Sequence, residues 1–215
     1  AHVPGRHFPC PHCPCQRVAV MSAQRVDAFG RRFPYLRLSL TEVCNYRCSY
    51  CLPNGYAADG RPRFLEQDEI ARLLRAFAGL GMRKVRLTGG EPSVRRDLPL
   101  IIETAAATPG IEKIALTTNG WKLPDTVDAW KAAGLTALNV SLDSLDAKRF
   151  HTITGHNLFD KVFQGVERAL TLGFDSVKLN AVLMRGVNDD ELPAWLQYLR
   201  ERDTAIRFIE LMQTG

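Results

Sequence analysis

The feature that most constrains the fold of this sequence is a regular alternation of short β-rich runs with longer helical segments. The segment 66–81, for example, carries apolar residues at the spacing of one face of an amphipathic helix. The expected strands are residues 35–40, 84–89, 113–119, 137–143, 176–184 and 205–212, and the expected helices are residues 66–81, 96–107, 124–134, 160–173 and 189–202. Six strands alternating with five helices predict an α/β fold with a parallel sheet and right-handed crossovers. The pattern alone is compatible with an open doubly wound sheet and with a partial (β/α) barrel.

The motifs richest in functional residue types follow these expected strands. "CNYRCSYC" (44–51) follows the first strand, "TGGEPS" (88–93) the second, "TTNG" (117–120) the third and "SLDS" (141–144) the fourth. Gly, Asn, Asp and Ser also favour ordinary turns, so any one of these motifs has a plain structural explanation. Both candidate architectures bind ligands at the carboxyl ends of their strands. Four such motifs on one rim therefore indicate a functional site there.

The composition excludes some classes of protein. The chain has 215 residues, which is enough for one large domain with a core. Charges interrupt every apolar stretch, so we expect no membrane span. The net charge of +5 suits a small anionic ligand but is too mild and dispersed to indicate a nucleic-acid partner. We recognise no secretion signal and expect a cytoplasmic location.

Three cysteines, Cys44, Cys48 and Cys51, lie within eight residues at the spacing C-x₃-C-x₂-C. Four readings compete: structural cysteines, a disulfide pair with one free thiol, a zinc site and an iron–sulfur cluster. A structural zinc site requires four ligands, and no histidine lies between His12 and His151. Iron–sulfur clusters are held by thiolates, and three cysteines on a cubane would leave one iron open to a ligand.

The first residues differ from the rest of the chain. Residues 1–20 are dense in proline, carry Cys10, Cys13 and Cys15, and show no periodicity, and Met21 is a candidate natural start. Segments of this kind rarely pack, so we expect a flexible leader over residues 1–28 and a core domain over residues 29–215. The alternative is that "CPHCPC" forms a small metal-binding knuckle.

The C-x₃-C-x₂-C motif after a first strand resembles that of the radical S-adenosylmethionine (SAM) enzymes. The resemblance includes the aromatic Tyr50 before the third cysteine and the later "GGEP". It implies a partial (β/α)6 barrel of the TIM type, with a [4Fe-4S] cluster held by Cys44, Cys48 and Cys51. It also implies that S-adenosyl-L-methionine binds the open iron, with Gly89, Gly90 and Glu91 beside its methionine end. In that family, an electron from the cluster breaks a C–S bond of the cofactor and releases a 5′-deoxyadenosyl radical.

Within that superfamily, the sequence resembles the GTP 3′,8-cyclases of molybdenum cofactor biosynthesis from about residue 29 to residue 215. The matching segments include "FPYLRLSLTEVCNYRCSYCLPNGY", "KVRLTGGEPSVRRDL", "LTTNGWKL", "NVSLDSLD", "VKLNAVLMRGVND" and "RFIELMQTG". The resemblance implies that the cofactor contacts Tyr50, Gly90, Ser141 and Met212, and that GTP contacts Arg37, Arg86, Thr117 and Lys178.

The same resemblance implies a reaction and partners. The radical takes hydrogen from C3′ of GTP, and the resulting carbon attacks C8 of guanine to give (8S)-3′,8-cyclo-7,8-dihydroguanosine 5′-triphosphate. The implied partners are an electron donor protein, a cyclic pyranopterin monophosphate synthase that takes the product, and a second copy of the chain in a homodimer.

The residues themselves support a polyphosphate ligand. Arg37, Arg86, Lys178 and Arg207 each lie inside an apolar strand. A single charge of this kind is usually a surface residue or pairs with a neighbouring acid. Four at similar strand positions indicate convergence on a polyphosphate, to which Asn119 and Asn180 would add polar contacts.

The family continues well beyond "ELMQTG" and carries a second set of three cysteines there, for a second cluster that binds guanine. Two alternatives to a GTP 3′,8-cyclase follow: a remnant that binds cluster and cofactor without GTP turnover, and a radical enzyme with another substrate. A replacement of the second cluster by Cys10, Cys13 and Cys15 is a further hypothesis.

Overall fold

The computed structural model describes residues 26–57 and 64–211, which form alternating strands and helices. The strands are β1 (Tyr35–Ser39), β2 (Lys84–Thr88), β3 (Lys113–Thr118), β4 (Ala137–Ser141), β5 (Ser176–Leu183) and β6 (Ala205–Glu210). The α-helices are α1 (Gln67–Gly79), α2 (Leu98–Ala106), α3 (Leu123–Ala132), α4 (Ala147–Thr154), α5 (Phe159–Thr171) and α6 (Leu192–Arg200). Two short 3₁₀ helices, η1 (Pro92–Val94) and η2 (Asp189–Glu191), complete the set.

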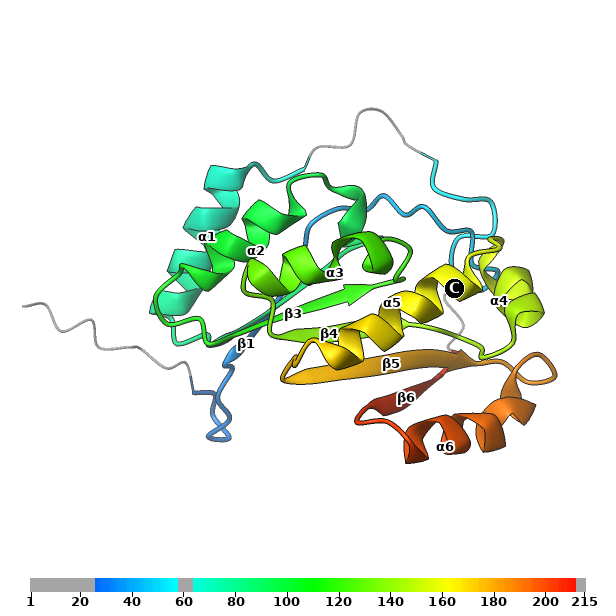
Figure 1. Ribbon diagram of the computed structural model, residues 1–215. Helices are drawn as coiled ribbons and strands as arrows, with labels where there is room; N and C mark the ends of the chain where they lie inside the picture. The colour runs from blue at the N-terminus through cyan, green and yellow to red at the C-terminus, as the bar shows by residue number, and fades with distance from the viewer. Residues whose placement is uncertain (1–25, 58–63, 212–215) are drawn as a thin grey trace, which may run out of the picture.

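The six strands form one parallel sheet in the order β1-β2-β3-β4-β5-β6, which is also their order along the chain. Figure 1 shows α1, α2, α3 and α5 on one side of this sheet, with α6 beside β6. In a doubly wound sheet the strand order reverses and helices cover both faces. The sequential order and the one-sided layer of helices instead confirm the predicted partial (β/α)6 barrel. None of the helices in the described residues has the length and apolar character needed to cross a bilayer.

The helix-covered face of the sheet forms the core. On this face, five residues lie side by side on five adjacent strands, four of them leucine and the last valine: Leu38, Leu87, Leu116, Leu138 and Val177. All five are buried. Successive side chains of a strand point to opposite faces, so the residues between these leucines must point away from the helices. The opposite face is therefore available to a ligand.

The predicted elements agree with the structure except at their ends and at one helix. The fourth strand ends at Ser141 rather than residue 143. The reason is that the Asp143 carboxylate, rather than the backbone ladder, takes the Val182 N–H. The last helix is α-helical only from Leu192, because residues 189–191 form a 3₁₀ turn before Pro193.

α4, which is eight residues long and mostly polar, was not among the predicted helices. Its end signals are nevertheless present. Asp146 caps the first turn by accepting a hydrogen bond from Arg149 N, and Gly155 ends the helix in the left-handed conformation at φ 74°. Both residue types are typical of these positions. α4 proves to be one of the supports of the cysteine-rich loop.

We predict opposite effects from one substitution in two helices. A Cβ atom on Gly165 of α5 would lie 2.4 Å from Leu123 Cβ, because α5 packs tightly on α3. Gly165→Ala should therefore lower the free energy of unfolding by roughly 1–3 kcal/mol. Gly79→Ala in α1, where the new methyl meets nothing within 4 Å, should leave stability unchanged or raise it by up to about 1 kcal/mol. Urea denaturation measures both, and equal effects would contradict the described α3–α5 contact.

Candidate functional site

The cysteine loop, residues 41–52, leaves the carboxyl end of β1 and is held first by the glycine pair after β2. Gly90 N donates to Thr41 O at 2.7 Å, and Glu91 N donates to Val43 O at 2.8 Å. A Cβ on Gly89 would lie 2.2 Å from Thr41 O, and one on Gly90 would lie 2.4 Å from Val43 O. Both positions must therefore be glycine for the two loops to meet. This close packing is a structural reason for the two glycines. Their contact with a cofactor stays a prediction.

Glu91 joins the end of β2 to the end of β3. Its side chain is 1% exposed. One carboxylate oxygen accepts from Ser93 N at 2.9 Å, from Ser93 Oγ at 2.5 Å and from Thr118 Oγ1 at 2.7 Å. The other accepts from Asn119 N at 2.6 Å. Burial raises the pKa of Glu91, and these hydrogen bonds oppose the shift. Both oxygens are engaged internally, and the predicted contact of Glu91 with the methionine end of the cofactor stays a prediction.

The third strand and α4 hold the other side of the cysteine loop. Asn119 Nδ2 donates to Asn45 Oδ1 at 2.9 Å, next to Cys44. Arg47 N and Ser49 N, on either side of Cys48, donate to Thr154 O at 3.1 Å and to Ile153 O at 2.9 Å. These carbonyls lie at the end of α4, where a helix leaves its last acceptors free. The loop therefore completes the hydrogen bonding of α4.

An aromatic contact supports the same side of the loop. The ring of Tyr46, between Cys44 and Cys48, is buried. It stacks on His156 with ring centroids 5.1 Å apart and meets Phe150 of α4 edge to face. Sequence reasoning missed Asn45, Tyr46 and His156, although "CNYRC" and "TGH" stand beside motifs that it used.

The three thiols are free. Cys44 and Cys48 are half-buried and Cys51 is exposed. Burial, together with the charges of Asp143, Cys44 and Cys51, raises the pKa of the Cys48 thiol to about 12. Burial likewise raises the pKa of Cys44, with Glu91 and Cys51 among the causes. Each thiol thus lies within electrostatic range of another.

The donor chemistry fits an iron–sulfur cluster, because thiolates are its usual ligands. In residues 26–57 and 64–211 no three side chains of Cys, His, Asp or Glu already stand close enough together to hold a metal ion. Loading of the site therefore requires the three thiols to converge and to lose their protons.

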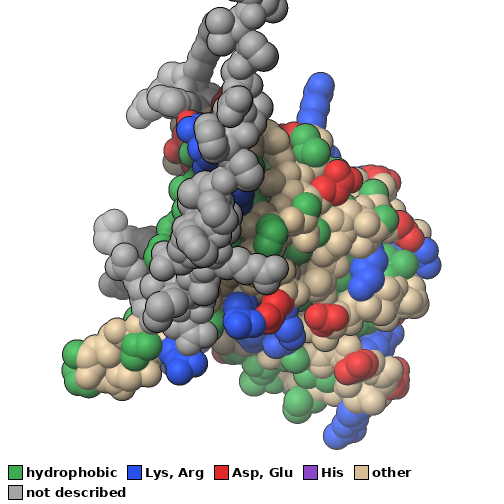
Figure 2. Space-filling view, turned by 90° about the vertical axis from the view of Figure 1, so that its left-hand side faces the viewer, with side chains coloured by type: hydrophobic (Ala, Val, Ile, Leu, Met, Phe, Trp, Pro, Cys, Tyr) green, Lys and Arg blue, Asp and Glu red, His purple; other side chains and the backbone are tan. Residues whose placement is uncertain are grey.

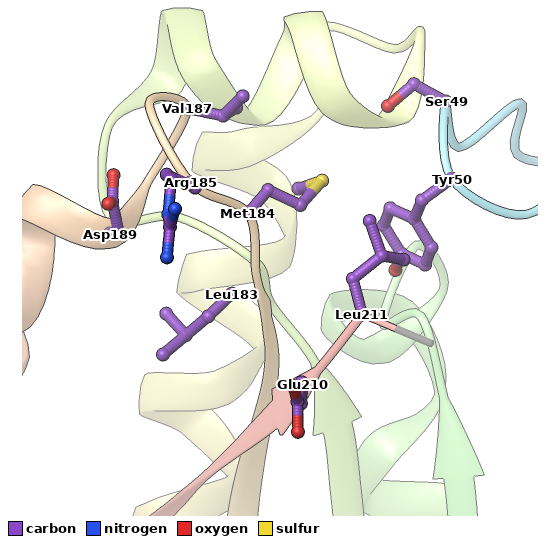
Figure 3. Close-up of a pocket in the computed structure, with 9 residues that line it drawn as sticks. All are labelled: Ser49, Tyr50, Leu183, Met184, Arg185, Val187, Asp189, Glu210 and Leu211. Atoms are coloured by element: carbon purple, nitrogen blue, oxygen red, sulfur yellow. The ribbon is translucent and has the colours of Figure 1, made fainter. Parts of the chain in front are cut away.

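Tyr50 lines a hollow of about 670 Å³ beside the cysteines. Figure 3 shows the side chains that surround it. The cysteine loop contributes Ser49 and Tyr50, the end of β5 and the following turn contribute Leu183, Met184, Arg185, Val187 and Asp189, and the end of β6 contributes Glu210 and Leu211. The hollow therefore joins the cysteine loop to the last two strands at the carboxyl rim.

A second hollow, of about 470 Å³, lies at the ends of β1 and β2. Arg37, Gly89 and Gly90 are among its lining residues. One hollow thus brings together a residue predicted to contact GTP and two predicted to contact the cofactor. Ser141 ends β4 opposite Asn180 of β5, on the same rim. Met212 lies outside the described residues, as do Cys10, Cys13 and Cys15.

The face of the sheet away from the helices carries six basic residues: Arg37, Lys84, Arg86, Lys113, Lys178 and Arg207. The strand register places Arg37 opposite Arg86 and Lys84 opposite Lys113. Arg207 of β6 lies opposite Asn180 of β5, the strand that carries Lys178. We call these six residues the basic face. Four of them were predicted from the sequence. Lys84 and Lys113 were not, although their positions two residues from Arg86 and Ala115 place them on the same face.

The basic face is not neutralised by acids. Among the described residues, none of its six members takes part in an ion pair. Burial lowers the pKa of Lys84, and the like charges of Arg86, Lys113, Lys178 and Arg207 lower it as well. In contrast, Figure 2, which looks onto the amino-terminal ends of the strands, shows Lys and Arg of the outer surface interspersed with Asp and Glu.

Two of the residues predicted to bind GTP contact each other. Arg86 Nη1 donates to Thr117 Oγ1 at 3.0 Å, and Arg86 Nε donates to the Tyr35 hydroxyl. Thr117 of β3 lies opposite Asn139 of β4, and Asn139 lies opposite Lys178 of β5. The structure therefore brings Arg37, Arg86, Thr117 and Lys178 onto one face. Their contact with GTP stays a prediction.

We predict that the Glu91 carboxylate is required for the site to hold its shape. Glu91→Gln would place an amide NH₂ against a backbone N–H in either orientation, because each carboxylate oxygen accepts from one. An unmatched buried polar group of this kind should lower the free energy of unfolding by roughly 1–3 kcal/mol. The control Glu112→Gln, at an exposed ion pair with Arg83, should change it by less than about 0.5 kcal/mol. Denaturant unfolding of both variants would contradict the account if their losses were equal.

Comparison with known sequences gives a family and close relatives. The model of the radical SAM superfamily matches residues 38–199. A protein of Stenotrophomonas maltophilia (strain R551-3) named GTP 3′,8-cyclase is 65% identical over 193 residues, which cover 90% of this chain and 59% of the relative. Proteins of the same name from Aeromonas hydrophila and Yersinia pestis are 58% and 57% identical, over 88% and 89% of this chain. The chain spans 57–59% of the length of these relatives.

Solved structures share the fold at low sequence identity. Streptococcus suis SuiB bound to S-adenosylmethionine superposes with a TM-score of 0.71 at 20% identity, over 85% of this chain and 42% of that one. HydG, a maturase of the [FeFe]-hydrogenase, superposes with a TM-score of 0.67 at 15% identity, over 84% of this chain and 43% of that one. With three cysteines and a glycine-rich turn on the rim of such a barrel, and a family model matching most of its length, this chain belongs to the radical SAM superfamily.

Proposed function

We propose that this chain is the cluster-binding and cofactor-binding part of a GTP 3′,8-cyclase. The single observation that carries the proposal is the basic face, whose cations form no ion pair with the described residues and which begins at Arg37, in the same hollow as Thr41 and Glu42 of the cysteine loop. The name shared by relatives of 57–65% identity supports the choice of GTP as the anion.

In this proposal, Cys44, Cys48 and Cys51 hold a [4Fe-4S] cluster, and S-adenosyl-L-methionine binds along the rim from Gly90 past Ser141 to Tyr50. When bound, cluster and cofactor supply a radical that takes hydrogen from C3′ of GTP. The residues of this chain then have two tasks. They fix the cysteine loop through its contacts with Gly90, Glu91 and α4, and they hold the substrate within reach of it.

The basic face binds the triphosphate. Arginine forks bind phosphate oxygens in pairs, and lysines act as compact positive charges. In the free protein four cations of the basic face disfavour the positive charge of Lys84, so a polyanion would relieve an unfavourable interaction as well as form new ones. Lys84 and Lys113 lie at the amino-terminal ends of their strands, farthest from the cysteine loop, and so extend the basic face toward the end of a polyphosphate chain.

The remaining assignments follow from the same proposal. Residues 29–215 form the core domain and residues 1–28 precede it. An electron donor protein reduces the cluster, a cyclic pyranopterin monophosphate synthase takes the product, and a second copy forms a homodimer in the cytoplasm. A second candidate function is cofactor binding without GTP turnover, since the hydrogen bonds described for the cysteine loop involve none of the six residues of the basic face.

We predict that the anaerobically reconstituted chain forms 5′-deoxyadenosine from S-adenosyl-L-methionine when dithionite is added. Formation should depend on Cys48 and increase when GTP is added, because GTP consumes the radical. Chromatographic quantification with and without GTP, and with Cys48→Ala as control, makes the test. Formation without a response to GTP would favour the second candidate function, and the absence of both product and iron would overturn the proposal.

We predict that Lys178→Gln weakens GTP binding by about tenfold or more. A hydrogen bond to a charged group contributes roughly 1.5–3 kcal/mol, and tenfold corresponds to about 1.4 kcal/mol. Lys161→Gln is the matched control, since Lys161 lies on α5 and pairs with Asp125 at the outer surface. Equilibrium dialysis with labelled GTP measures both variants. Equal affinities for GTP in the two variants would remove the basic face from the substrate site.

A further inference from the structure

We propose that Asp143 is a positioning residue that holds the cysteine loop against the end of β5 and so sets the width of the hollow at Tyr50. Neither the cysteine motif nor the glycine motif includes this residue. The inference rests on the proposed function, because it names what shapes the cofactor site.

Asp143 connects two segments through one carboxylate. It follows β4, and its side chain is 4% exposed. One oxygen accepts from the Tyr50 hydroxyl at 2.8 Å, and the other accepts from Val182 N at 2.8 Å. Tyr50 belongs to the cysteine loop and Val182 to β5. The carboxylate is therefore the polar link between the two.

Asn188 extends this link to the turn after β5. Its side chain is 1% exposed. Nδ2 donates to Asp143 O at 2.7 Å and to Val182 O at 2.9 Å, and Oδ1 accepts from Met184 N at 2.8 Å. Every polar atom of the Asn188 amide thus has a partner on β5, on the turn or on Asp143. The turn that carries Met184 and Val187 cannot shift without breaking this set.

The hollow lies between the two segments that Asp143 connects. In Figure 3 Tyr50 and Ser49 come from the cysteine loop, while Met184, Arg185 and Val187 come from the turn after β5. The Asp143 carboxylate joins these two walls indirectly, through its bonds with the Tyr50 hydroxyl and with Val182 N. Its loss would leave the Tyr50 ring free to move relative to Met184, and a ligand between them would lose a fixed wall.

Burying a carboxylate costs free energy, because the charged group leaves water. The burial of Asp143 at this position therefore supports a role beyond packing. Burial raises the pKa of Asp143, and its hydrogen bonds from Val182 N and Tyr50 oppose the shift. Asp143 also faces the Cys48 thiol, and its negative charge raises the pKa of that thiol. Among the described residues, no Lys or Arg forms an ion pair with Asp143. Directional hydrogen bonds, and not charge pairing, therefore hold the carboxylate.

Two substitutions test the inference. Tyr50→Phe removes only the hydroxyl. Asp143→Asn keeps one acceptor oxygen for Val182 N and turns NH₂ toward the Tyr50 hydroxyl, which must then accept instead of donate, so that a bond to a carboxylate is replaced by a weaker neutral one. The matched control is Tyr198→Phe, which removes a hydroxyl of equal bond length, 2.8 Å to Glu167, between α6 and α5. The double variant Tyr50→Phe/Asp143→Asn shows whether the two residues act through one bond.

The measurements are made on the full chain after anaerobic reconstitution with iron and sulfide. Iron content reports on the cluster, equilibrium dialysis gives the dissociation constant of S-adenosyl-L-methionine, and the EPR spectrum of the dithionite-reduced protein is recorded with and without the cofactor. We expect unchanged iron in both single variants, roughly tenfold weaker cofactor binding in Tyr50→Phe, and a smaller loss of cofactor binding in Asp143→Asn, where the weaker neutral bond remains. The double variant should bind no more weakly than Tyr50→Phe. The cofactor-induced EPR change should return at saturating cofactor, and Tyr198→Phe should match the unmodified chain.

Each other outcome is decisive. Wild-type affinity in both single variants would overturn the inference. Parallel loss of iron and of cofactor binding would make Asp143 a structural brace of the cluster and would overturn it as well. If the unmodified chain holds iron but does not bind S-adenosyl-L-methionine, the proposed function fails and the inference falls with it.

Discussion

The site depends on the contact between two stretches of backbone, Thr41–Val43 at the start of the cysteine loop and Gly90–Glu91 after β2. Two hydrogen bonds of 2.7 and 2.8 Å join them, and a side chain at either glycine would separate them. This contact fixes where Cys44 leaves the sheet. Because the start of the loop is fixed, its later residues Arg47 and Ser49 can reach the end of α4 and pair with it.

Charge is distributed unevenly around that loop. The buried acids Glu91 and Asp143 flank the cysteines, and both are held by neutral hydrogen-bond donors. The unpaired cations lie farther down the inner face, on five of the six strands. The acids are occupied by internal partners, whereas none of these cations forms an ion pair with another described residue. The inner face is therefore the part of the site that attracts an anion from solvent, while the rim keeps its shape without one.

The fold was largely predictable from the sequence because its strands and long helices differ in period. The spacing of apolar residues in segment 66–81 predicts a helix, and the apolar run at 84–89 predicts a strand. α4 escaped prediction because eight mostly polar residues give little periodicity, and only Asp146 and Gly155 mark its ends. In the site, the cysteines and the basic strand residues were recognisable. Lys84 and Lys113 could have been found by counting in twos from Arg86 and Ala115.

The supports of the site were harder to predict, since they depend on distant segments. Nothing in "SLDS" indicates that Asp143 meets Tyr50, 93 residues away along the chain. The use of Glu91 as an internal link between β2 and β3 could not be seen either, because its partners Thr118 and Asn119 come from the next unit of the barrel. The sequence motifs identify the chemistry, and the tertiary structure determines which of their residues are free to carry it.

The most direct test of the central claim, that cysteine loop and basic face form one site, is the fate of a hydrogen atom. The reconstituted chain is given S-adenosyl-L-methionine, dithionite and GTP that carries deuterium at C3′, and the 5′-deoxyadenosine is analysed by mass spectrometry. If the basic face holds GTP beside the cofactor, the 5′-deoxyadenosine gains deuterium, and Lys178→Gln reduces the gain. If 5′-deoxyadenosine forms without deuterium, the cysteine loop and the basic face do not serve one reaction, and the account is wrong.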